Sequence, residues 1–147
     1  MRLLLAWAGL LCAGVACEPA YLPTIAPKDA QFTVACAPGC GASGRDPGVV
    51  IDVSFVGHGR QYNVCCSDVP ALRARLSTII DYWCDGLDVP EIRIGELTVG
   101  VTESLASNKR GATLDQGEGY VAFNCDDWLP SLVARLGEQT CCADKTP

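Results

Sequence analysis

The chain lacks the residues that several common chemistries require. It has a single histidine, His58, and no Cys-x-x-Cys pair. Zinc centres are built from clustered Cys and His, and thiol redox sites usually carry Cys-x-x-Cys, so neither is expected. No Gly-x-Ser-x-Gly stretch is present, and a hydrolytic triad would have to form around His58 without local support. No Asn-x-Ser/Thr occurs, so N-glycosylation is not expected. These absences predict a protein without enzymatic activity, metal or cofactor.

Basic residues are also scarce relative to acidic ones. The chain has 11 Lys and Arg against 17 Asp and Glu. A nucleic-acid-binding surface needs clustered Lys and Arg to neutralise phosphates. We therefore expect no nucleic acid partner.

Only one long apolar run is present, and it lies at the N-terminus. Leu3–Ala16 follows the basic Arg2 and leads into small residues, which is the pattern of a secretory signal peptide and is too short to span a membrane. The sequence predicts a signal at 1–17, an extended proline-containing arm at 18–30 and one domain at 31–147. It also predicts a secreted, extracellular product that is not an integral membrane protein. Cleavage after Ala16, cleavage after Cys17 and a lipid on Cys17 remain alternatives.

Cysteine, in contrast, is abundant. Of ten cysteines, Cys12 leaves with the signal, and removal or lipidation of Cys17 leaves eight in the body. An even number in a secreted domain indicates structural disulfides. The eight can pair in about 105 ways, and nothing in the sequence selects one. The predicted disulfide cysteines are Cys36, Cys40, Cys65, Cys66, Cys84, Cys125, Cys141 and Cys142.

Hydrophobic periodicity predicts short strands and two helices. The helices start near Ser67 or Asp68 and near Asp126 or Asp127, and we expect Asp68 and Asp127 to be their caps because a carboxylate there accepts free backbone N–H groups. The expected strands are 31–36, a hairpin over 49–65, one kinked strand or two short strands over 91–104, and 120–125.

The two helix starts resemble each other. Val64–Leu76 reads VCCSDVPALRARL and Phe123–Leu136 reads FNCDDWLPSLVARL, which suggests a repeated unit with one extra residue in the second copy. Two such β-α units predict an α+β fold, a disulfide-stapled α/β sandwich in which one antiparallel sheet carries both helices on one face.

Three further features are candidate sites. His58 lies at the predicted hairpin turn, where a solvated residue is expected rather than a general base. The pair Asp126–Asp127 could serve a glycosidase, but helix capping explains it more simply. Lys109–Arg110 lies in a predicted polar loop and suits cleavage by a kexin-type processing protease, with an ordinary solvated loop as the alternative.

One segment resembles a known family. The stretches WCDGL (83–87) and GELTVGVT (95–102) follow a Cys-led helix and resemble the small fungal killer toxins and killer-toxin-like secreted effectors over Cys65 to Thr102. The resemblance implies a compact disulfide-rich α/β sandwich and a secreted, non-enzymatic protein that acts on a membrane, channel or receptor of another cell. The chain departs from the family's single-chain branch in its second helix and its acidic charge, so no functional residue is carried over.

Two other functional classes remain. Eight cysteines with two doublets resemble a hydrophobin, a structural surface protein, although the order of single and paired cysteines differs and two capped helices are unexpected there. A small extracellular hydrolase is the third and least favoured interpretation.

Overall fold

The strands form two antiparallel sheets. The computed structural model describes residues 30–40, 44–55, 58–104 and 109–139; the predicted signal, nearly all of the predicted arm, and Cys141 and Cys142 lie outside these residues. The first sheet has the order β1-β2-β3 and the second the order β4-β5-β6-β7. The strands are β1 (Gln31–Cys40), β2 (Asp46–Phe55), β3 (His58–Cys65), β4 (Ile92–Ile94), β5 (Leu97–Ser104), β6 (Lys109–Asp115) and β7 (Tyr120–Asn124).

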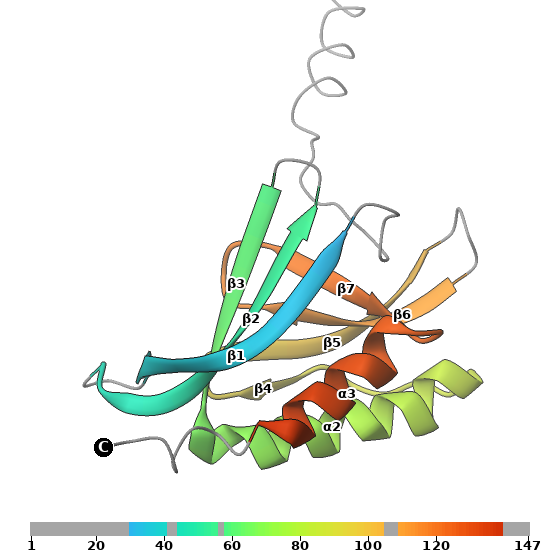
Figure 1. The fold of residues 1–147 in the computed structure, drawn as a ribbon. Helices are drawn as coiled ribbons and strands as arrows, with labels where there is room; N and C mark the ends of the chain where they lie inside the picture. The colour runs from blue at the N-terminus through green and yellow to red at the C-terminus, as the bar shows by residue number, and fades with distance from the viewer. Residues whose placement is uncertain (1–29, 41–43, 56–57, 105–108, 140–147) are drawn as a thin grey trace, which may run out of the picture.

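The helices follow the last strand of each sheet. A short 3-10 turn, η2 (Cys66–Asp68), leads from β3 into α2 (Val69–Asp81), and α3 (Trp128–Glu138) follows β7. A second 3-10 turn, η3 (Trp83–Asp85), ends the α2 segment. Figure 1 shows the strands of the first sheet crossing those of the second, with α2 and α3 side by side. The α+β class predicted from the sequence is confirmed, but the strands divide between two sheets instead of forming one.

Two local features build the second sheet. Gly95, at φ 63°, turns the chain between β4 and β5, so 91–104 forms a hairpin in which Ile94 pairs with Leu97. The segment predicted as a polar loop contains β6, which pairs with β5 and β7. The loop assignment was wrong at this point because Ala112 and Leu114, which are buried, are the only strong apolar signal among polar and glycine residues.

One hydrophobic core lies between the sheets and the helices. In β2, Val49, Ile51 and Val53 alternate inward, as a strand with one buried face requires. In both helices the apolar residues that recur at helical spacing face this core, and Ile80 and Val133 are partly buried. The fully buried helix residues are Leu72, Leu76, Ile79, Leu129, Leu132 and Leu136.

Three aromatic rings join the two sheets to α3. Phe32 of β1 meets Phe123 of β7 edge-on, with ring centroids 5.3 Å apart. Trp128, at the start of α3, lies 4.9 Å from the Phe32 ring and 5.5 Å from the Phe123 ring. Aromatic pairs in such arrangements contribute about 0.5–1.5 kcal/mol each beyond their buried area. This cluster therefore connects the first strand of the chain with its last strand and last helix.

The repeat is more extensive than the sequence comparison suggested. When each residue is matched to the one 60 positions later, the helix starts align without a gap, so the extra residue expected in the second copy is absent. Each copy is a three-stranded meander followed by a helix, β1-β2-β3-α2 and β5-β6-β7-α3, and β4 is an addition to the second. Among the matched pairs with the same burial are Val69 and Leu129, Pro70 and Pro130, Leu72 and Leu132, and Leu76 and Leu136.

The matched arginines of the two helices each bind the other half of the molecule. Arg135 donates from Nη1 to the Phe32 carbonyl at 2.8 Å, and its guanidinium lies 4.6 Å from the centroid of the Phe32 ring. Its counterpart Arg75 donates from Nη2 to the Pro90 carbonyl, just before β4. The arginine of each copy thus fixes the segment where the strands of the other copy begin.

We expect Arg135→Ala to lower the free energy of unfolding by about 1–2 kcal/mol, because it removes a charged hydrogen bond and a cation–π contact. The shift of the urea midpoint at constant m-value measures this loss. Arg93→Ala, at an exposed position of β4, is the matched control and should change stability by less than about 0.5 kcal/mol. Equal losses of stability in the two variants would contradict the proposal that Arg135 stabilises the fold through its contact with Phe32.

Candidate functional site

Disulfides connect the ends of the strands and helices. Cys40 at the end of β1 is bonded to Cys65 at the end of β3, and Cys84 of η3 is bonded to Cys125, which follows β7. Cys65 and Cys125 are matched positions of the repeat, so each copy is fixed at its strand-to-helix junction. Cys36 and Cys66 are also disulfide-bonded. Among the described residues, no group of three potential metal-binding side chains occurs.

The predicted caps occupy the expected positions but do not bond as expected. Asp68 and Asp127 are the residues directly before α2 and α3, and neither side chain makes a capping hydrogen bond. In α3 the acceptor is Asn124, whose Oδ1 takes hydrogen bonds from the N–H groups of Asp127 at 2.8 Å and Trp128 at 3.0 Å. Asn124 is 8% exposed and belongs to β7. The sequence pattern did not identify Asn124 as the cap, because it lies at the end of a predicted strand and not directly before the helix.

The pair Asp126–Asp127 is not arranged as two facing carboxylates. Asp126 forms an ion pair with Lys109 Nζ at 3.1 Å, and both side chains are more than half exposed. Such a surface pair contributes little to stability, about 0–1 kcal/mol. Its role here is to hold the start of β6 beside the start of α3. The side chain of His58, the other catalytic candidate, lies outside the described residues.

The dibasic pair lies at the start of β6, an inner strand of the second sheet. The Arg110 guanidinium lies 4.1 Å from the centroid of the Trp83 ring, its Nη1 donates to the Trp83 carbonyl at 3.2 Å, and its Nη2 is 3.7 Å from Glu103 Oε1. Gly111 is buried, and a Cβ there would come within 2.6 Å of the Phe123 carbonyl oxygen. A protease must bind its substrate as an exposed, extended segment, so the Arg110–Gly111 bond is protected while the sheet is intact.

A polar hollow of about 580 Å³ lies along β3, the outer strand of the first sheet. The side-chain amide of Gln116 binds both backbone groups of Asn63 there, at 2.8 and 3.2 Å. The Tyr62 hydroxyl donates to the Gly119 carbonyl at 3.4 Å, and burial raises the pKa of Tyr62 above its usual range, so the phenol stays neutral. The sequence did not indicate this hollow, because β3 and the β6–β7 connection meet only after folding.

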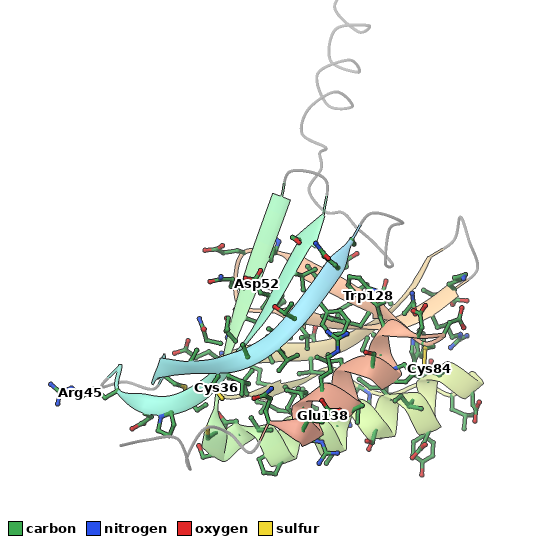
Figure 2. All side chains as sticks on the ribbon, viewed as in Figure 1. Cys36, Arg45, Asp52, Cys84, Trp128 and Glu138 are labelled. Carbon is green, nitrogen blue, oxygen red and sulfur yellow. A yellow bond between two sulfur atoms is a disulfide. The ribbon has the colours of Figure 1, made fainter. Side chains whose placement is uncertain are left out.

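The turn after α2 exposes two large apolar side chains. Tyr82 is 50% exposed and Leu87 is 57% exposed, although Trp83 between them is buried. The Leu87 N–H donates to the Tyr82 carbonyl at 2.8 Å, which closes the turn. Figure 2 shows Cys84 at this end of α2, with its disulfide directed toward the second sheet. We call residues 82–87 the Tyr82–Leu87 knob.

The surroundings of this knob are acidic. Asp81, Asp85 and Asp88 are all exposed. Between Arg75 and Arg93 the chain contains no Lys, Arg or His. The nearest cation that contacts the turn, Arg110, is paired with Glu103 and with the Trp83 ring. The knob therefore combines two exposed apolar side chains with acidic neighbours.

Comparison with known proteins adds no assignment. No protein-family model matches the chain, and no curated protein matches it.

We expect Asn124→Ala to lower the free energy of unfolding by about 1–2 kcal/mol, because it removes the side chain that caps α3. Asp127→Ala is the matched control and should cost much less, since its carboxylate makes no capping bond. Asn124→Asp keeps an acceptor and should recover part of the loss. Chemical unfolding of the three variants measures these differences; a larger loss for Asp127→Ala than for Asn124→Ala would contradict the assignment of the cap.

Proposed function

We propose that this protein is a secreted, non-enzymatic, cysteine-rich protein of the killer-toxin-like or effector type. It acts by binding a membrane, channel or other surface target on a cell of another organism. Virulence toward that organism, or competition between fungi, is the biological setting that the proposal implies.

The observation that carries the proposal is the disulfide framework. The Cys40–Cys65 and Cys84–Cys125 bridges join segments far apart in the chain, with separations of 25 and 41 residues, and two more of the described cysteines are bonded. Disulfides of this density persist in oxidising compartments and stabilise small domains that must keep their shape outside the cell. Among the described residues, no helix is long and apolar enough to cross a membrane.

The use of the charged side chains favours binding over catalysis. Arg110, Arg135 and Lys109 are engaged with Trp83, Phe32 and Asp126 in contacts that hold elements together. The polar hollow beside β3 has three charged lining residues, Asp52, Arg60 and Glu118. The contacts made there hold the structure together: Gln61 donates to the Asp52 carboxylate at 3.1 Å, and the Gln116 amide binds the Asn63 backbone. The exposed Tyr82–Leu87 knob, in contrast, has the character of a protein-binding surface.

The killer-toxin resemblance falls on this same region. The stretch WCDGL contains η3 and all of the knob except Tyr82, and GELTVGVT contains the β4–β5 turn and most of β5. The hydrogen bond from Trp83 Nε1 to the Thr102 carbonyl, at 3.3 Å, joins the two stretches to each other, and the Cys84–Cys125 disulfide joins the first stretch to the residue after β7.

The hydrophobin-like alternative is less well supported. A protein that coats an interface needs a broad apolar face, whereas among the described residues the exposed large apolar side chains are Tyr82, Leu87 and Tyr120. Tyr120 lies on β7, apart in sequence from the other two.

The oxidised protein, added to fungal and plant cells, is expected to inhibit growth or cause ion leakage in at least one cell type at low concentration. The Cys84→Ser/Cys125→Ser variant, which lacks the bridge beside the knob, should lose most of this potency. Growth assays and conductivity of the medium measure the two effects.

The two alternative functions predict different outcomes when the same purified protein is assayed. A hydrophobin-like protein would leave all cells unaffected and would form a stable film at an air–water interface. A hydrolase would turn over a substrate and lose that turnover on His58→Ala. Either result would overturn the proposed function.

A further inference from the structure

The Tyr82–Leu87 knob is rigid before any partner arrives. The Tyr82 N–H donates to the Thr78 carbonyl at 2.9 Å, and the Asp85 and Gly86 N–H groups return to the Tyr82 and Trp83 carbonyls at 3.1 and 2.9 Å. Gly86 adopts φ 98°, a conformation that favours glycine, and so permits the tight reversal. The backbone that carries both exposed side chains is therefore fixed by its own hydrogen bonds.

Trp83 and Cys84 attach the knob to the second sheet. Trp83 is 9% exposed, with Arg110 stacked on its ring and the Thr102 carbonyl bound by its indole N–H. The Cys84–Cys125 disulfide joins the residue after Trp83 to the segment between β7 and α3. Tyr82 and Leu87 contribute little to this anchoring, since half or more of each side chain is in solvent. Their exposure is consequently not explained by folding.

Such an arrangement has the properties of a binding hot spot. Tyrosine is enriched among the residues that dominate interface energies, and it loses little conformational freedom when bound. A preorganised backbone lowers the entropy cost of association. Isolated exposed apolar residues are common on proteins; two that are held together at a rigid turn are less so.

The charges around the knob restrict the kind of partner. Asp81, Asp85 and Asp88 are exposed on the same turn and its flanks, and Glu91 follows them. Their field repels anionic lipid headgroups and attracts surfaces rich in Lys and Arg. Charge complementarity of this type accelerates encounter and selects the orientation of docking.

We propose that the Tyr82–Leu87 knob inserts into an apolar pocket, rimmed by Lys or Arg, on a target protein. The inference rests on the proposed function and specifies the contact surface and the chemistry of its partner. Tyr82 and Leu87 fill the pocket, and the three aspartates meet its basic rim.

A random-peptide phage library tests the chemistry of the partner. The library is selected on the full oxidised chain and then assayed on two variants, Tyr82→Ser/Leu87→Ser and the control Tyr120→Ser, which removes a tyrosine that is 41% exposed on β7. We expect selected clones to carry Lys or Arg beside aliphatic or aromatic residues. They should bind the control as tightly as the unchanged protein and the double variant about tenfold or more weakly, a loss typical of hot spots.

The salt dependence of peptide binding is a second measurement. Binding of the selected peptides should weaken as salt rises, and Asp81→Asn/Asp85→Asn/Asp88→Asn should reduce that salt dependence. Because the substituted residues are exposed, all variants should retain the unfolding midpoint of the unchanged protein. If the double variant unfolds early, Leu87→Ser alone serves in its place.

Four results would overturn the inference. The selected clones could bind all variants equally, or be rich in Asp and Glu. Vesicles containing phosphatidylserine could bind the unchanged protein and not the double variant, which would make a membrane the occupant. The double variant could also retain full potency on a cell type that the unchanged protein inhibits. If the double variant keeps full potency, the proposed function stands and only the assigned surface fails. If the unchanged protein affects no cell type, the proposed function fails, and the peptide-binding experiment tests the surface independently.

Discussion

The contact of Phe32, Phe123 and Trp128 is the constraint on which the rest of the structure depends. It is the place where the first sheet, the second sheet and α3 meet, with the Arg135 guanidinium covering the Phe32 ring. Without it, each meander would have only its own helix to cover its apolar face. Small sheets of three or four strands need such cover to be stable. The arginine hydrogen bond and the ring contacts therefore join two marginal units into one core.

The repeat explains where the disulfides and the candidate surface lie. Cys65 and Cys125 hold matched strand-to-helix junctions, so bridges and side-chain contacts reinforce the same architecture in both halves. The Tyr82–Leu87 knob belongs to the connection between the two units, after α2 and before β4. Connections of this type are free to vary without disturbing the core and commonly carry function on a rigid scaffold. The position of the knob in the fold thus agrees with the chemistry of its exposed side chains.

Patterns that depend on neighbours in the chain were predictable. The helix stripes ending at Leu76 and Leu136 follow from periodicity, and Pro70 and Pro130 mark the first turns. Features that depend on distant partners were not, since β6 is stabilised by neighbours on both sides despite weak strand signals. The cap of α3 is local but was also missed, because Asn124 lies at the end of the preceding strand and not directly before the helix. Cysteine pairing, the division into two sheets and the exposure of Tyr82 and Leu87 all depend on how the two units pack, which local sequence does not encode.

The most direct test of this account is the intact mass of the protein secreted by a yeast that contains a kexin-type protease, measured before and after reduction, with free thiols counted. The account predicts a single chain that stays single on reduction, because the Arg110–Gly111 bond lies inside the second sheet. It also predicts no free thiol among the eight predicted disulfide cysteines, with Cys40 linked to Cys65 and Cys84 to Cys125. Two chains separated after Arg110, or other partners for these cysteines, would contradict it.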